Sequence, residues 1–496
     1  MQTIPPSRAL FRAGRRTIGG AAFVFASLAA APLAAQGADS LDLPLARALE
    51  MARGGEEVGL AARQLDAATA AVGSAKAGGL PTLRLGTTFS HVYENARAQA
   101  VGQIFNQPNT YNANLTLGVP LFQGGRTRQQ TRAAVNLRDA ATAQIAEAEL
   151  DVTLQTLNAY LAAQLADRLV AIQDTNLVLA EARVRQAEQF EQGGRGSRYD
   201  VLRARVERSN LEPLAIAARG ERDLALLELR RLTNIPEGVP LRLSTQLDPA
   251  NVRAAADAVA GAAMVDSAAL EALPAVRAAR LRARAGDANI RAANAALLPT
   301  VQLNLVNGYQ AFPLEWTIPV KGGALATVDC PEGSEATRVC TQQNGGWFSD
   351  RSLQLQVSWP VFDGNRARND LRQIRAQAAV ADLQAVQAVE NARAAAARAR
   401  TEMDRARATF DAVRQTVAEA EEAFRLATLR YSRGLGTQLE VSDAQLALLT
   451  ARTNEARAVY DLYLAAAELA RAQGKPIPLP VSTPTEPRRT IGTVIP

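Results

Sequence analysis

Residues 114–126 read NLTLGVPLFQGGR, and residues 354–366 read QLQVSWPVFDGNR. The two stretches match position by position at a shift of 240 residues, with an alternating run, a proline, a phenylalanine and a final arginine in each. At the same shift Asp200 meets Glu440. An internal repeat of this length decides the fold, because both copies must form the same elements. The sequence therefore predicts two tandem copies of one unit.

Each copy contains two runs in which apolar and polar residues alternate. We predict these runs at about 82–92 and 111–122 in the first copy, and at about 299–310 and 351–362 in the second. A period of two with one apolar face is typical of a half-buried strand. Each run has about ten residues, which is the length that a tilted strand needs to cross a bilayer.

A long proline-free stretch follows each strand pair and predicts a long helix, at 125–190 and at 365–431. A helix of this length would extend about 100 Å at 1.5 Å per residue. In the second stretch apolar residues recur at alternating spacings of three and four, from Met403 to Tyr431. This heptad pattern favours packing against neighbouring long helices.

A turn that contains glycine ends each long helix and leads into a returning helix. The turn glycines are Gly193, Gly434 and Gly436, and the returning helices are predicted at 199–232 and 439–473. Their starts are marked by Ser197-x-x-Asp200 and Thr437-x-x-Glu440. Both are acidic variants of the capping box, which satisfies the first free N–H groups of a helix.

These elements divide the chain into five segments. Residues 1–35 have the features of a secretory signal peptide, since arginines precede an apolar run that ends in small residues. The first repeat covers 36–232, a linker covers 233–264, the second repeat covers 265–473, and a proline-rich tail covers 474–496. No stretch after the signal segment approaches the roughly 20 apolar residues of a membrane-spanning helix. We therefore expect a periplasmic or secreted protein, or a β-structure in an outer membrane.

The composition argues against an enzyme and against a nucleic-acid-binding protein. The chain has one histidine and two cysteines, which excludes histidine-based acid–base chemistry and nearly every transition-metal site. The net charge of +6 includes four arginines of the signal segment, and the other basic residues are spread between acidic ones. We expect no catalytic residues, no metal, no cofactor and no nucleic-acid partner.

Cys330 and Cys340 lie in an insertion of the second copy. The tripeptide LPT occurs at 80–82 and at 298–300, a shift of 218, so the second copy has 22 additional residues before Pro360. In an oxidising compartment two such cysteines favour a disulfide that closes a short loop, and two free thiols are the alternative.

Strands that lie in lipid must belong to a closed sheet, because unpaired backbone groups are costly in hydrocarbon. Four strands per chain cannot enclose a barrel, since about eight strands are the practical minimum. Other copies of the chain must therefore complete the sheet, most simply as a ring, and the long helices would continue from it as a tube.

In the order and spacing of these elements the sequence resembles the TolC-like outer-membrane efflux proteins, over roughly residues 41–475. The matching pieces are the tandem copies, the strand pairs, Pro120-x-Phe122-x-Gly124 with Pro360-x-Phe362-x-Gly364, and the tips Phe190-x-x-Gly193 and Tyr431-x-x-Gly434. The resemblance implies a mainly α fold with membrane β-structure. Three chains with four strands each would form one 12-stranded β-barrel, continuous with a coiled-coil α-barrel of long helices.

The resemblance also implies a function and partners. The chain would be the passive exit duct of a tripartite efflux or type I secretion system, located in the outer membrane and extending into the periplasm. Its partners would be two further copies, a periplasmic adaptor protein, an inner-membrane transporter of the ABC or RND type, and outer-membrane lipid. The alternative is a periplasmic coiled-coil scaffold, which accounts for the heptads but not for the duplicated strand pairs.

Glu440 and Asp443 lie one helical turn apart at the second tip. The helix dipole favours an acidic residue in a first turn, which accounts well for Glu440. It accounts less well for Asp443, because like charges at this spacing repel each other. By resemblance the pair matches the acidic rings that narrow the closed periplasmic entrance and attract cations.

The resemblance matches Tyr431 and Asp200 to a pair that latches the closed tip through a hydrogen bond. For Tyr431 the alternative is the last residue of the heptad seam. The latching arginine of the family corresponds to Gly436 here. The closed tip of this chain is therefore expected to be tethered differently, with Arg433 and Arg198 as candidates.

Overall fold

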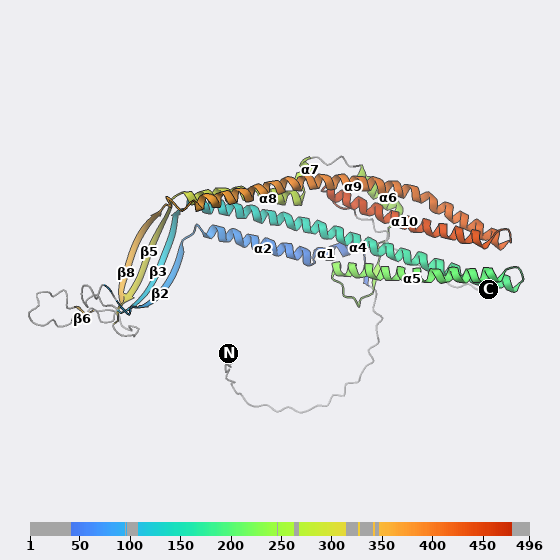
Figure 1. Cartoon of the computed structure of the whole chain (residues 1–496), viewed down its shortest axis with the longest axis horizontal. Coiled ribbons are helices and arrows are strands. Elements are labelled where there is room, and N and C mark those ends of the chain that lie inside the picture. The colour runs from blue at the N-terminus through green and yellow to red at the C-terminus, as the bar shows by residue number, and fades with distance from the viewer. Residues whose placement is uncertain are drawn as a thin grey trace, which may run out of the picture.

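The computed structural model describes residues 41–94, 96, 108–245, 247–261, 267–313, 326–327, 341–342 and 347–478. The predicted signal peptide, the predicted disulfide between Cys330 and Cys340 and most of the proline-rich tail lie outside these residues. The molecule is elongated, with a sheet at one end, long helices along its length and two helical turns at the other end (Figure 1).

Four antiparallel strands form the sheet. They are β2 (Thr82–His91), β3 (Asn109–Phe122), β5 (Thr300–Ala311) and β8 (Trp347–Ser358), in the spatial order β2-β3-β5-β8. The two inner strands are paired on both sides, whereas β2 and β8 are each paired on one side. The sheet is therefore open at both edges within one chain.

The register places leucines of all four strands on the same face of the sheet. Leu85 pairs with Leu115, Leu117 pairs with Leu305, and Leu305 pairs with Leu353. Residues directly opposite each other, and residues two apart on one strand, point to the same side. These side chains are uncovered, with Leu85 76% exposed and Leu353 69% exposed. A contiguous exposed apolar face of this kind marks a surface that meets lipid or another protein.

The opposite face of the sheet is polar. Arg84 pairs with Thr116 there, and Gln302 pairs with Gln356. An apolar face and a polar face on the same strands are the pattern of a barrel wall between lipid and a water-filled interior.

The fourth strand lies earlier than the sequence predicted. The prediction was about 351–362, and β8 spans Trp347–Ser358. The apolar–polar alternation continues through Val361, but Pro360 has no N–H and restricts the residue before it. Strand pairing therefore ends at Ser358, opposite Thr300. In the first copy the matching proline, Pro120, lies inside β3 opposite Gln302, and a register shift follows it.

Four helices continue from the sheet toward the middle of the molecule (Figure 1). They are α2 (Glu56–Ala77), α4 (Arg126–Gln192), α8 (Pro274–Asn294) and α9 (Arg366–Ser432). Contacts join α2 to α4, α4 to α8 and α8 to α9, so the helices follow the same order as the strands. Both α4 and α9 have 67 residues, so each extends about 100 Å.

Beyond the middle, two helices return from the far turns. They are α5 (Arg198–Thr233), packed on α4, and α10 (Gln438–Ala472), packed on α9 and α4. The spatial order there is α5, α4, α10, α9. Within the part of the chain that the structure describes, every helix is too short or too polar to cross a membrane.

Short elements surround the helices at mid-length. They are β1 (Leu41–Leu43), α1 (Leu45–Arg53), β4 (Leu241–Leu243), α6 (Pro249–Ala260) and α7 (Ser267–Ala272). The 3-10 turn η2 (Ala295–Leu297) instead joins α8 to β5 beside the sheet, and β6 (Ala326–Thr327) pairs separately with β7 (Thr341–Gln342). At mid-length the helices also build the core. The largest apolar core lies here and includes Leu157, Met403 and Leu462, all fully buried. The Tyr160 hydroxyl donates to the Leu43 carbonyl at 2.9 Å, which ties β1 to α4. The predicted linker thus contains a strand and a helix that complete this core.

Candidate functional site at the helical tips

The two far turns have the same backbone. The first turn joins α4 to α5 and the second joins α9 to α10. Gly194 and Gly434 have φ values of +67° and +74°, in the left-handed region that favours glycine. The N–H of the following residue donates to the carbonyl of Phe190 in the first turn and of Arg430 in the second, at 2.9 and 2.8 Å. The two turns are therefore equivalent at the 240-residue shift of the repeat.

This equivalence corrects the pairing of Phe190-x-x-Gly193 with Tyr431-x-x-Gly434 that the sequence suggested. Gly193 lies in the first turn as predicted, but its φ of −82° is open to any residue. The counterpart of Gly434 is Gly194, and the counterpart of Phe190 is Arg430 rather than Tyr431. Gly436 also lies in the second turn, where an added Cβ would come within 3.2 Å of the Arg430 side chain.

The second tip presents two carboxylates to solvent. The Thr437 hydroxyl accepts a hydrogen bond from the N–H of Glu440 at 3.3 Å and caps α10. An Arg430 nitrogen lies 3.9 Å from Glu440 Oε2, and both side chains are largely exposed, so this ion pair contributes little. Asp443 follows one turn later and is exposed. Among the described residues Asp443 has no hydrogen bond or ion pair, so the two charges are largely uncompensated.

The first tip has no such excess of negative charge. Asp200 accepts hydrogen bonds from the N–H and the hydroxyl of Ser197, at 3.1 and 2.7 Å, and forms a complete capping box. Arg203 stands at the position of Asp443 and donates to Glu207 at 3.1 Å. The same backbone therefore carries balanced charges in one copy and an acidic pair in the other.

Tyr431 and Asp200 are near each other but not bonded. Within the described ranges no hydrogen bond joins them, and Oδ2 of Asp200 accepts from the N–H and the hydroxyl of Ser197 instead. The ring of Tyr431 packs against Phe190 with centroids 5.8 Å apart. Burial raises the pKa of Tyr431, the Asp200 charge raises it further, and Arg183 opposes the rise. The latch between Tyr431 and Asp200 stays a prediction.

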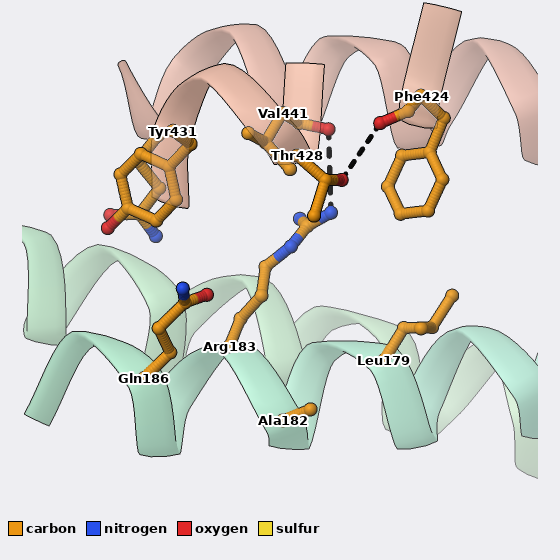
Figure 2. Close-up of a pocket in the computed structure, with 9 residues that line it drawn as sticks. Leu179, Ala182, Arg183, Gln186, Phe424, Thr428, Tyr431 and Val441 are labelled. Atoms are coloured by element: carbon orange, nitrogen blue, oxygen red, sulfur yellow. Dashed lines mark hydrogen bonds between the residues drawn. The ribbon is translucent and has the colours of Figure 1, made fainter. Parts of the chain in front are cut away.

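Two polar contacts that the sequence did not predict join the first hairpin, α4–α5, to the second hairpin, α9–α10. The Ser442 hydroxyl donates to Glu207 at 2.9 Å. Arg183 donates to the Val441 carbonyl at 3.4 Å, and its guanidinium lies 5.8 Å from the centre of the Phe424 ring (Figure 2). Burial lowers the pKa of Arg183, although nearby Glu207 counteracts this effect. No sequence motif marks Arg183 or Ser442, so the sequence offered no signal for these contacts.

A cavity of about 130 Å³ lies between the hairpins beside Arg183 and Tyr431. Figure 2 shows Arg183 and Gln186 pointing from α4 toward the second hairpin. Gln438 also lines the cavity and is only 7% exposed, and neither of its amide atoms has a partner among the described residues. Buried amide groups without hydrogen bonds are costly. The hairpins are therefore joined at the tips by polar contacts that are only partly satisfied.

The described residues contain no cluster of three or more His, Cys, Asp or Glu side chains with the arrangement of metal ligands. The tips do carry exposed charges and a polar contact between the hairpins. An exposed acidic pair attracts cations, and a polar contact between two hairpins can break and reform at moderate cost.

Comparison with known proteins identifies the same two repeats. The family described as "Outer membrane efflux protein" matches residues 56–234 and 265–475. The outer membrane efflux protein BepC of Brucella suis biovar 1 (strain 1330) is 25% identical over 366 residues, which cover 74% of this chain and 72% of BepC.

Solved outer-membrane channels share the fold. The outer membrane protein VceC of Vibrio cholerae is 21% identical with a TM-score of 0.67, covering 88% of this chain and 97% of VceC. The CmeC outer membrane channel of Campylobacter jejuni is 15% identical with a TM-score of 0.70, covering 87% of this chain and 85% of CmeC. Each similarity covers more than four fifths of both chains.

Proposed function

This chain belongs to the outer membrane efflux protein family, and we propose that three copies assemble into the exit duct of a tripartite efflux system. The protein is an outer-membrane efflux channel that extends into the periplasm, and it is not an enzyme. The proposed duct is passive. An inner-membrane transporter of the ABC or RND type would supply the energy, and a periplasmic adaptor would connect the two.

The main observation behind the proposal is that the sheet of a single chain has two unpaired edges. The sheet ends at β2 on one side and at β8 on the other, and neither strand is paired on its outer edge. Such edges are not tolerated in hydrocarbon, so another copy must pair with each of them. Three copies supply twelve strands, which is above the minimum for a closed barrel with a water-filled interior.

The helical edges support the same assembly. On α5, which ends one side of the wall, five large apolar side chains between Leu202 and Leu224 are at least half exposed: Leu202, Val206, Leu214, Ile216 and Leu224. On α9, at the other side, Val380, Leu383 and Val386 are also exposed. Rows of exposed apolar residues on long helices are typical of helix packing surfaces. We infer that α9 of one copy packs against α2 and α5 of the next.

We place the gate of the duct at the second tip. Glu440 and Asp443 of three copies would contribute six carboxylates to the periplasmic entrance. In a narrow ring these charges attract cations and hold counter-ions in the opening. Opening would separate the second hairpin from the first, and would break the contacts of Arg183 with Val441 and of Ser442 with Glu207.

A direct test measures assembly and conductance of protein extracted from membranes. We expect a trimer that forms cation-preferring channels in planar bilayers. The double substitution Glu440→Ala and Asp443→Ala should remove most of the cation preference. The pair Glu221→Ala and Asp223→Ala on α5 removes the same charge away from the tip and should leave the preference unchanged. A stable, water-soluble monomer with this complete fold would refute the assembly, and unchanged selectivity of the tip variant would refute the gate.

The proposal leaves drugs and secreted proteins as alternative cargoes. Purification of the channel from membranes after mild crosslinking, followed by identification of the adaptor and transporter that accompany it, distinguishes efflux of small molecules from type I secretion. The scaffold alternative does not account for family membership or for a sheet with an exposed apolar face.

A further inference from the structure

A cluster of polar side chains on β5 and β8 interrupts the apolar face of the sheet. In the register of β5 and β8, Asn307 pairs with Arg351, and the next pair on the same face is Tyr309 with Ser349. All four side chains are exposed. Opposite residues in antiparallel strands have Cβ atoms about 5 Å apart, so these four side chains form one cluster. We call Asn307, Tyr309, Ser349 and Arg351 the strand patch.

The strand patch lies within the apolar band, toward its outer end. The pair Leu305–Leu353 lies on the helix side of it, and the pair Ala311–Trp347 lies on the other side. The helices extend from the opposite end of the strands, into the periplasm, so Trp347 marks the cell-surface side. With about 3.3 Å per residue and a tilt near 40°, Arg351 lies about 10 Å below the level of Trp347.

An arginine on a lipid-facing surface needs a partner, because an isolated charge is costly in hydrocarbon. The described residues of the sheet do not provide one. Asp350 is the only acidic residue in the four strands, and it lies on the polar face, where Gln310 donates to it at 3.3 Å. The strand that would pair with β8 in the assembled ring is β2 of the next copy, which contains no acidic residue. Neither the same chain's strands nor the neighbour's can therefore neutralise Arg351.

We propose that the strand patch binds the phosphate group of an outer-leaflet lipid. The guanidinium group of Arg351 matches phosphate geometry through two parallel hydrogen bonds. Its long apolar stem can extend toward the headgroup region while it remains in contact with Leu353 and the acyl chains. The amide of Asn307 and the hydroxyls of Tyr309 and Ser349 supply further donors for phosphate or sugar oxygens.

The position of β8 determines where the lipid would lie. Since β8 is an edge strand, the strand patch is next to the seam between two copies, and the trimer would carry three such sites. A lipid bound there would contact both chains and strengthen the seam. This inference rests on the proposed function, because the apolar face must lie in the outer membrane for the patch to meet lipid.

Binding can be measured by native mass spectrometry on intact trimers in a neutral detergent. The probes are lipid A with its phosphates and the same lipid A after enzymatic dephosphorylation. We expect the wild-type trimer to retain up to three phosphorylated molecules and to bind the dephosphorylated form at least tenfold more weakly. Arg351→Gln should weaken binding of the phosphorylated form at least tenfold. Arg351→Lys keeps the positive charge and should weaken this binding less.

Arg84→Gln is the matched control, because Arg84 is also a strand arginine but lies on the polar face. We expect this variant to bind lipid A as the wild type does. Equal retention of the two lipids by the wild type, or full retention by Arg351→Gln, would overturn the lipid site. Dissociation of Arg351→Gln trimers in detergent without any lipid would also overturn it, since the arginine would then have a protein partner.

Conductance of the same samples in bilayers of neutral lipid separates this inference from the proposed function. If the wild type forms no trimers and no channels, the proposed function fails. If the trimers conduct but retain lipid A without regard to its phosphates, only the lipid site fails.

Discussion

The middle of the molecule and its tips differ in what holds the two hairpins together. At mid-length, side chains from α1, α4, α6, α9 and α10 form one continuous apolar core, with Leu157, Leu161 and Leu462 fully buried. At the tips the hairpins meet through the polar contacts of Arg183 and Ser442, the ring contact of Phe190 with Tyr431, and a cavity beside the buried amide of Gln438. Apolar cores resist local opening, whereas regions with few buried apolar contacts open at low cost. Movement of the hairpins should therefore be confined to the tips, with the middle as the anchor.

The largest effect is expected from a cavity in the middle. Leu462→Ala removes a fully buried side chain of the core and should lower the free energy of unfolding by about 2–5 kcal/mol. Leu446→Ala on the same helix is the control, because Leu446 is 62% exposed in the single chain. Denaturant unfolding followed by circular dichroism measures both. Equal losses in the two variants would contradict the assignment of the middle as the anchor.

A smaller effect, of opposite sign, is expected at the tips. Gln438→Met replaces a buried amide without partners by an apolar side chain of similar length, which should stabilise the closed tips by about 1–3 kcal/mol. Single-channel recordings should then show fewer openings. Gln186→Met changes a partly exposed glutamine at the same cavity and should have little effect. More frequent openings of Gln438→Met would show that the amide stabilises the closed state.

The caps of the two returning helices should also differ. Ser197→Ala removes a complete capping box from α5, at a cost of about 1 kcal/mol. Thr437→Ala removes one acceptor from α10 and should cost less, because the Glu440 side chain does not accept from the Thr437 N–H. Hydrogen exchange of the first-turn amides in each helix measures the difference. Equal losses of protection would mean that the hydrogen bond from the Ser197 N–H to Asp200 does not stabilise the start of α5.

The last prediction concerns the buried tyrosines of the mid-length core. Their effect on the pH dependence of stability is absent at neutral pH and appears only in alkaline solution. Burial raises the pKa of Tyr160 and of Tyr463 above the ordinary value for tyrosine. The unfolded chain releases these protons near pH 10, while the folded chain keeps them. The contribution of the two tyrosines to the free energy of unfolding is therefore complete below pH 10 and is lost as the pH rises further. The midpoint temperature of thermal unfolding should fall between pH 8 and pH 11, and it should fall less in Tyr463→Phe than in the wild type. The same drop in both would exclude Tyr463 as a cause.

Much of the fold could be predicted because its signals are local. The absence of proline over 125–190 and 365–431 and the glycines that follow place α4 and α9 within two residues of their observed ends. The apolar–polar alternation placed β8 four residues too late, because it continues past Pro360 although the strand pairing ends before that residue. Glu440 and Asp443 lie in the first turns of α10, where the resemblance implied an acidic entrance.

The contacts of the candidate site were harder to predict. Arg183, Ser442 and Gln438 have no motif, and their importance comes from the partners that the fold brings to them. Ser442 and Glu207 are 235 residues apart in the chain, and Arg183 and Val441 are 258 apart. The polar character of Asp200 was evident, but its use in a capping box rather than in a bond to Tyr431 depends on side-chain geometry at the turn.

The sequence by itself determined the two repeats, the alternation of strand and long helix, and the acidic second tip. These follow from periodicity, capping residues and turn glycines, which act over a few neighbouring residues. Only the tertiary structure decided which side chains join the two hairpins, which face of the sheet carries Arg351, and which edges remain open. Those features depend on packing and strand register between segments that are far apart in the chain, where a shift of one residue would turn a side chain to the other face.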